Sequence, residues 1–322
     1  MCGIAGIIHK DGPSSIGREM TRMLQSMKHR GPDSTGYALY GPPSEDYVMR
    51  IKLADAHAGH DYEYAQRLRR NRSEIERRVG ALGATIRAGD VRTKGAANGS
   101  TDVHDLPYAM DIRFAYDGDL KDLTDRVEDV KGTEVISLGH SLEIIKDLGD
   151  AETVAADYHL SGLQGTHAIG HVRMATESDV DISGAHPYWA YPFSDVAVVH
   201  NGQLTNYHYW TRRLEREGHR FQSENDSEVI AVYIAQRMSE GSSLEEAMNQ
   251  SLEDLDGVFT YICVTEDSLG MAKDELAAKP LVLYESDGIV AMASEEIALH
   301  AVLDDDIETY DPFESEVMVW QR

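Results

Sequence analysis

The alternation of apolar and polar positions along the chain predicts groups of strands separated by helices. Residues 2–9 form a short apolar run that is typical of a buried strand. Residues 14–27 place Ile16, Met20 and Met23 at helical spacing, and a serine just before them is suited to cap that helix. Further strands are expected at 37–40, 81–88, 110–116, 168–174, 195–200, 258–265, 281–284, 289–293 and 317–320.

The order of these elements indicates the fold class. Because strands come in groups with helices between the groups, we expect an α+β fold in which helices cover sheets, rather than a doubly wound fold. Further helices are expected at 61–79, 141–148, 151–158, 205–217, 227–238, 244–252 and 295–302.

The middle section, 44–165, gives mixed signals. Its helix at 61–79 carries six arginines. In an acidic chain such a basic stretch suggests a contact surface, although a solvated helix face is the more frequent explanation.

Charge and cysteine content restrict the class of protein. The chain has 322 residues, of which 56 are acidic and 30 basic, and a net charge of −26. This charge argues against nucleic acid or an anionic membrane as the main partner. Two cysteines, Cys2 and Cys263, cannot form a disulfide scaffold, so a reducing compartment is favoured. No signal peptide and no run of ~18 apolar residues is visible, which indicates a cytoplasmic protein.

Cys2 combines two reactive groups if Met1 is removed. It then carries a thiol and a free α-amine on one residue. The thiolate is a strong nucleophile, and an amine with a pKa of roughly 8 can act as a base near neutral pH. An ordinary buried cysteine in a first strand is the alternative, because cysteine is among the most buried residue types.

A possible oxyanion hole follows the predicted strand at 195–200. An asparagine side-chain amide beside a glycine backbone N–H, as at Asn201 and Gly202, offers two donors at one point. A hairpin turn is the alternative, because Asn-Gly is the strongest short hairpin signal.

Three further charged residues suit an amino-acid ligand. Arg173 ends a predicted strand, where its guanidinium can fork onto a carboxylate, although surface ion pairs are common. Asp226 precedes a helix and suits an ammonium group, although a helix N-cap is the commoner role. Arg30 lies in the glycine-containing loop 29–36, which we interpret as a mobile cover.

We expect no metal site. His167 and His171 lie four residues apart, but on a predicted strand, where they are too far apart to share a zinc ion.

As an ordered set, these motifs resemble those of the class II glutamine amidotransferases, which are N-terminal-nucleophile hydrolases. The resemblance covers 2–40 and 166–322. It implies a four-layer αββα sandwich with two antiparallel sheets, in one domain spanning 1–322, with an inserted α/β section at about 44–165. The resemblance implies these roles: Cys2 as nucleophile with its α-amine as base, Asn201 and Gly202 as the oxyanion hole, Arg173 and Thr176 as contacts to the glutamine α-carboxylate, Asp226 as the contact to the α-ammonium, and Arg30 on the mobile loop over the substrate.

The middle section narrows the resemblance. Segments 139–150 and 165–171 look like the insertion of glutamate-synthase-like amidotransferases, which include the stand-alone amidotransferase subunit of N-methylglutamate synthase. The resemblance implies that this chain holds no cofactor and that its partner is a synthase subunit carrying FMN. It also allows a third subunit in the complex. We therefore expect a glutaminase that supplies ammonia to a partner. The alternative is a structural or regulatory subunit that binds glutamine or glutamate with little turnover.

Overall fold

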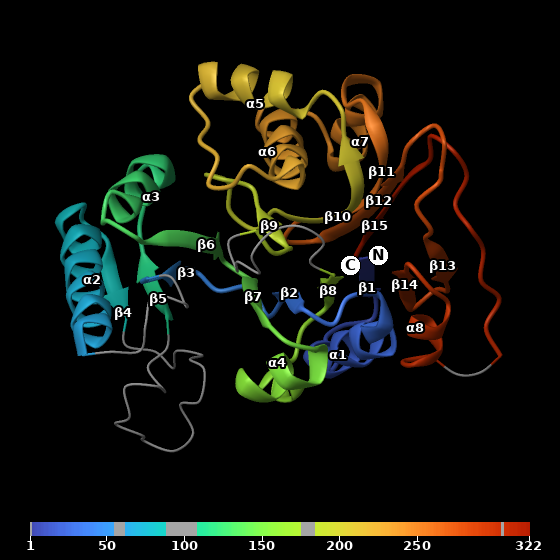
Figure 1. The fold of residues 1–322 in the computed structure, drawn as a ribbon, viewed down its shortest axis with the longest axis horizontal. Coiled ribbons are helices and arrows are strands. Elements are labelled where there is room, and N and C mark those ends of the chain that lie inside the picture. Colours follow the sequence, from blue (N-terminus) through green and yellow to red (C-terminus); the bar gives the residue numbers. More distant parts are fainter. Residues whose placement is uncertain (1, 55–61, 88–107, 175–183, 304–305) are drawn as a thin grey trace.

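Two sheets lie face to face at the centre of the molecule, and a third sheet extends from one side (Figure 1). The structure is a computed structural model. It describes residues 2–54, 62–87, 108–174, 184–303 and 306–322.

The first sheet has six strands, and every neighbouring pair is antiparallel. Helices α1 (Ile16–Ser26), α4 (Ala151–Asp157) and α8 (Ile297–His300) cover its outer face. Helix α1 packs closely because Gly170 has no side chain: a Cβ there would lie 2.6 Å from Leu24 Cδ1. In spatial order, the strands are β13 (Val282–Glu285), β14 (Ile289–Ala293), β1 (Gly3–His9), β8 (His167–Arg173), β2 (Ser34–Tyr40) and β7 (Leu142–Leu148).

The second sheet is also antiparallel and has five strands. Helices α5 (Tyr207–Arg216), α6 (Asp226–Ser239) and α7 (Leu244–Asp254) lie on its outer side. Helix α7 begins with a capping box, in which Ser243 and Glu246 each bond the other's backbone N–H. In spatial order, the strands are β15 (Val317–Gln321), β12 (Ser268–Lys273), β11 (Gly257–Val264), β10 (Ala197–Leu204) and β9 (Tyr188–Trp189).

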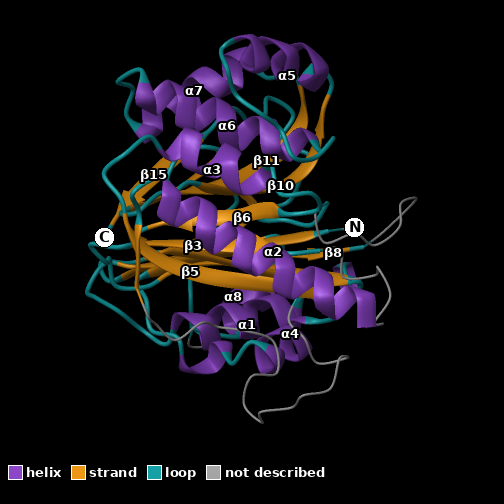
Figure 2. Cartoon of the chain, turned by 90° about the vertical axis from the view of Figure 1, so that its left-hand side faces the viewer, coloured by secondary structure: helices purple, strands orange, loops and turns teal. Residues whose placement is uncertain are grey.

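The two sheets bury one apolar core between them. Ile4 and Ile169 from the first sheet share a fully buried cluster with Ile262 and Leu269 from the second. Figure 2 shows the resulting sequence of layers, helix, sheet, sheet, helix. The prediction of a four-layer αββα sandwich is therefore confirmed.

The third sheet is formed within the middle section, with helices α2 (Tyr62–Ala81) and α3 (Leu120–Glu128) beside it. The expected α/β character of this insertion is wrong, because all three strand pairings are antiparallel. Helix α2 connects β3 to β4, but β5 lies between these two strands in the sheet. The helix therefore does not join two neighbouring parallel strands, as the helix of an α/β unit would. The strands, in order, are β4 (Thr85–Arg87), β5 (Ala109–Ala115), β3 (Tyr47–Lys52) and β6 (Glu134–Gly139).

Strand β7 (Leu142–Leu148) takes the place of the helix expected at 141–148. Ile144 belongs to the core between the sheets, whereas Ile145 belongs to the core beneath α1. A strand buried on both faces loses the alternation of apolar and polar positions that identifies a strand in sequence. Strands β3, β6, β9 and β12 and helix α3 were also not predicted, while the helix expected at 61–79 is confirmed as α2. The assignment of 1–322 to one domain stays a prediction. No helix within the described ranges is long and apolar enough to cross a membrane.

Candidate active site

Cys2 lies at the start of β1, the strand between β14 and β8 in the first sheet. Its side chain is a free thiol, and the residue is partly exposed rather than fully buried. The backbone that follows is fixed, since Ile4 N donates to Ser294 Oγ at 3.0 Å and Gly3 pairs with Val172 on β8. The thiol is thus held on a rigid strand at an accessible end.

Asn201 reaches Cys2 from the second sheet. Its Nδ2 donates to Ser294 Oγ at 3.1 Å and to the backbone oxygen of Cys2 at 3.4 Å. The second contact is long and therefore weak, which leaves this N–H available to a stronger acceptor. The structure brings together a nucleophile and an amide donor that are 199 residues apart in sequence.

Gly202 continues strand β10, so the hairpin turn considered for Asn201 and Gly202 is wrong. Pairing with β11 runs without a break from Ala197 to Leu204. Gly202 has φ +134°, and a Cβ there would lie 2.1 Å from Val258 O. Any other residue at this position would clash with β11 and adopt a strained conformation.

Arg30 is placed differently from our expectation of a mobile cover. It lies in a 3₁₀-helix, η1 (Lys28–Arg30), and its side chain is 9% exposed. Its Nε donates to the backbone oxygen of Cys2 at 2.9 Å, and its Nη1 donates to Glu295 Oε1 at 2.7 Å. These two hydrogen bonds hold the buried guanidinium of Arg30 against the residue that precedes β1. Arg30 therefore anchors the backbone of Cys2.

Glu295 completes this anchor. Burial raises the pKa of its carboxyl, but the hydrogen bond from Arg30 and the charges of His29 and Arg30 outweigh that effect and leave the pKa below its ordinary value. The motifs in the sequence did not indicate Ser294 or Glu295 as site residues. Ser294 lies between the strand predicted at 289–293 and the helix predicted at 295–302, and Glu295 begins that helix, so both lie at the end of a strand, where side chains of a sheet gather.

Arg173 is the last residue of β8. Because Gly3 pairs with Val172, Arg173 lies at the same end of the sheet as Cys2. Its side chain is half-buried, and its Nη1 donates to Gly184 O at 2.9 Å. Contact with a substrate carboxylate stays a prediction. Thr176, the other expected carboxylate contact, lies outside the described residues.

Asp226 is the first residue of α6, and it is not the helix cap. The side chain of Asn225 caps the helix by accepting from Ser227 N at 3.0 Å. Asp226 Oδ2 instead accepts from Leu204 N at 2.7 Å, and its side chain is 18% exposed. Leu204 and Asn201 lie on the same strand, three residues and roughly 10 Å apart. The carboxylate is thus fixed to the strand that carries Asn201.

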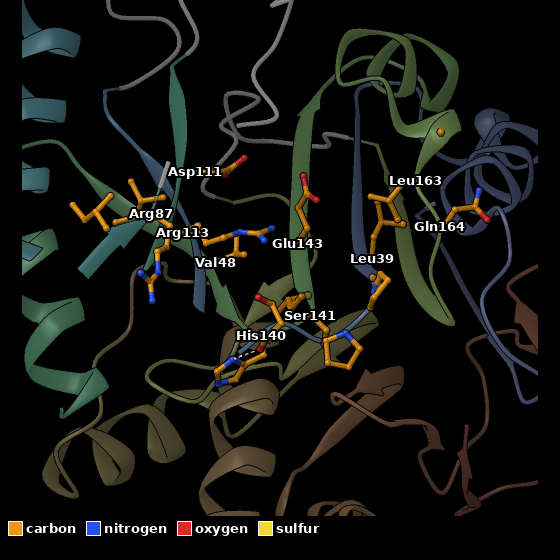
Figure 3. A pocket seen from close by; sticks show the side chains of 18 of the residues that line it. Leu39, Val48, Arg87, Asp111, Arg113, His140, Ser141, Glu143, Leu163 and Gln164 are labelled. Carbon is orange, nitrogen blue, oxygen red and sulfur yellow. Dashed lines mark hydrogen bonds between the residues drawn. The ribbon is translucent and has the colours of Figure 1, made fainter. Parts of the chain in front are cut away.

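A cavity of about 740 Å³ opens elsewhere, between the third sheet and strands β2 and β7. Figure 3 shows Arg87 and Arg113 on one side and Glu143 on another. None of the predicted site residues lines it. Acidic and basic side chains are mixed in its wall, so its charge favours no single class of ligand. We therefore place the candidate active site at Cys2, where the chemistry lies.

The chain resembles known proteins along its whole length. The chain is 39% identical over 322 residues to a "putative glutamine amidotransferase" of Methanothermobacter thermautotrophicus, covering 98% of this chain and 99% of the relative. The chain belongs to the class II glutamine amidotransferases. The chain is also 33% identical to the "Glutamine amidotransferase-like protein GlxB" of Rhizobium meliloti, over 100% of this chain and 99% of that protein. The family model described as a glutamine amidotransferase domain matches residues 171–301.

Solved structures show the same fold. The glutamine phosphoribosylpyrophosphate amidotransferase of B. subtilis superposes with a TM-score of 0.59 at 18% identity, covering 99% of this amidotransferase chain. The chain spans 47% of the length of that structure. The fold is therefore that of the N-terminal-nucleophile amidotransferases. In the described part of the chain, no three His, Cys, Asp or Glu side chains form a group that could hold a metal ion.

Proposed function

We propose that the chain hydrolyses the side-chain amide of glutamine through a thioester on Cys2 and delivers the ammonia to a partner synthase subunit. The observation that carries this proposal is the convergence of the Asn201 side-chain amide on Cys2, with Nδ2 3.4 Å from the Cys2 backbone oxygen. Membership of the amidotransferase family supports glutamine as the substrate.

In the first half-reaction, the α-amine of Cys2 takes the thiol proton and the thiolate attacks the amide carbon of glutamine. Negative charge then forms on the carbonyl oxygen, where the Asn201 Nδ2–H and Gly202 N–H stabilise it. One such donor lowers the barrier by roughly 3–4 kcal/mol. The carbon–nitrogen bond breaks, and the leaving nitrogen takes the proton from the Cys2 ammonium to depart as ammonia.

In the second half-reaction, water gives a proton to the free α-amine and attacks the thioester. The carbon–sulfur bond breaks, the thiol regains its proton, and glutamate leaves. Arg173 and Asp226 bind the amino-acid end of the substrate throughout. Arg30 holds the Cys2 backbone oxygen at 2.9 Å, which fixes the direction of the nucleophile relative to Asn201.

The partner is an FMN-carrying subunit of a glutamate-synthase-like or N-methylglutamate synthase complex. The sequence resemblance of segments 139–150 and 165–171 supports this choice. FMN belongs to the partner, and no step of the glutaminase reaction in this chain requires it. A partner of this kind gives the ammonia an acceptor close to its site of release.

A glutaminase assay tests the proposal. Glutamate and ammonia released from glutamine are measured for the full chain, with Cys2→Ser as the inactive variant and Cys263→Ala as the control. Cys263 is fully buried in the second sheet, so its replacement removes the other thiol of the chain without touching the site. We expect loss of turnover in Cys2→Ser alone. Equal turnover in Cys2→Ser and the parent chain would refute the mechanism, and glutamine binding without turnover in the parent would favour a regulatory subunit.

A further inference from the structure

Ser227 joins two buried histidines to Asp226. Its Oγ lies 2.8 Å from His186 Nε2, 2.8 Å from His200 Nδ1 and 3.4 Å from Asp226 Oδ1. Ser227 is 1% exposed, and His171 stacks on the His186 ring with centroids 4.2 Å apart. Buried polar groups are nearly always hydrogen-bonded, so the partners of each group in this network have to be identified.

Burial keeps the two histidines neutral. It lowers the pKa of His186 well below its ordinary value, and it lowers that of His200 although the charge of Asp226 opposes the change. A neutral imidazole carries a single N–H and one acceptor nitrogen. His186 Nδ1 and His200 Nε2 have no hydrogen-bond partner among the described residues.

The number of donors and acceptors in the network determines which atom donates in each hydrogen bond. A buried N–H without a partner is rarer than a buried acceptor without one. The protons therefore lie on His186 Nε2 and His200 Nδ1, and both rings donate to Ser227 Oγ. With both lone pairs of its oxygen occupied, Ser227 directs its own O–H toward Asp226 Oδ1.

We propose that Ser227, oriented by His186 and His200, is a positioning residue that fixes the Asp226 carboxylate to receive the α-ammonium group of the substrate. This inference rests on the proposed function. Asp226 is held from two sides, by a short hydrogen bond of 2.7 Å from Leu204 N to Oδ2 and by a longer and weaker one of 3.4 Å from Ser227 Oγ to Oδ1. An ionised carboxylate has about four acceptor positions, so two remain for an ammonium group.

The network predicts a preference within the substrate class. A fixed carboxylate favours free α-amino acids over the same acyl chain without the amine, because only the amine reaches Asp226. Glutaramate, which is glutamine without its α-amino group, is therefore the informative comparison. A general packing defect would affect both compounds equally, whereas loss of this positioning affects glutamine alone.

The test compares Ser227→Ala with a matched control, Ser251→Ala. Ser251 is also fully buried and its replacement removes two hydrogen bonds, to Met248 O at 2.7 Å and to the Tyr261 hydroxyl at 2.6 Å, against three for Ser227, but it lies in α7. For Ser227→Ala we expect KM for glutamine to rise about tenfold with kcat nearly unchanged, and KM for glutaramate to stay constant. Ser251→Ala should change neither KM.

Two further measurements separate the possible failures. In an Asp226→Asn background, Ser227→Ala should add no further rise in KM, because both changes remove one interaction. In a Cys2→Ser background, calorimetry should show glutamine affinity falling about tenfold on Ser227→Ala, which requires no turnover. An unchanged KM and affinity, or equal effects on glutamine and glutaramate, would overturn the positioning role. Binding of glutamine without turnover in the parent chain would overturn the proposed function alone, and absence of binding would overturn both.

Discussion

Replacing Arg30 by methionine separates its structural role from the substrate-covering role that the sequence suggested. Methionine keeps an unbranched apolar stem but removes the hydrogen bonds to Cys2 O and Glu295 Oε1. Hydrogen bonds that involve a charged group contribute roughly 1.5–3 kcal/mol each. Glu295 is 30% exposed and can be rehydrated, so the loss on that side is at the low end of the range. We expect the two losses together to lower the free energy of unfolding by about 3–4.5 kcal/mol and Tm by roughly 4–7 °C.

The catalytic effect should appear in kcat. Without Arg30, the Cys2 backbone loses its 2.9 Å restraint, and a nucleophile displaced by about 1 Å costs roughly 100-fold in rate. KM for glutamine should stay within about twofold, because the guanidinium is buried and its hydrogen bonds go to Cys2 O and Glu295. Steady-state glutaminase kinetics and thermal denaturation of the same preparations measure both effects.

The matched control is Lys28→Met. Lys28 lies on the same 3₁₀-helix and also loses an ion pair, to Asp150 Oδ2 at 2.5 Å, but its side chain is 49% exposed. We expect kcat, KM and Tm close to those of the parent chain. If Arg30→Met instead raised KM tenfold with kcat preserved, Arg30 would be a substrate contact and the anchoring argument would be refuted.

Four further predictions concern the two cysteines, the stability at high pH, the substrate carboxylate and the N-terminus. Burial raises the pKa of Cys263 to about 12, so only about one such thiol in 10⁴ is ionised at pH 8, and iodoacetamide should label the folded chain at Cys2 alone; peptide mass mapping that finds labelled Cys263 in folded protein would contradict this. Because the unfolded thiol ionises near pH 9, the contribution of Cys263 to stability should fall as the pH rises above 9, which denaturant titrations at pH 8 and pH 10 can measure. Arg173→Lys should raise KM for glutamine far more than it slows alkylation of Cys2, since lysine cannot form the bidentate fork, and an unchanged KM would remove Arg173 from the carboxylate role. Intact mass of fully active protein should show Met1 absent, because an amide nitrogen cannot take the thiol proton near pH 7; an active chain that retains Met1 would exclude the N-terminal nucleophile mechanism.

Local patterns in the sequence determined much of the fold. Helix α1 was predicted because Ile16, Met20 and Met23 keep the helical spacing of a helix with one buried face. The αββα layers followed from the family resemblance of motifs such as those at Cys2 and Asn201, and they are confirmed. Strand β7 was missed because both of its faces are buried, so its pattern of side chains carries no period of two.

Tertiary structure alone decided how the site is assembled. The sequence placed Asn201 and Gly202 in a plausible turn, and only pairing with β11 extends the strand through them and turns the Asn201 amide toward Cys2. The sequence marked Arg30 as part of a polar loop, whereas its partners, Cys2 O and Glu295, lie 28 and 265 residues away in the chain. Residue type and short-range spacing determine which chemistry is available. Which groups meet depends on contacts between distant segments: Cys2, Arg30 and Glu295 meet when the first sheet forms, and Asn201 joins them when the second sheet packs against it.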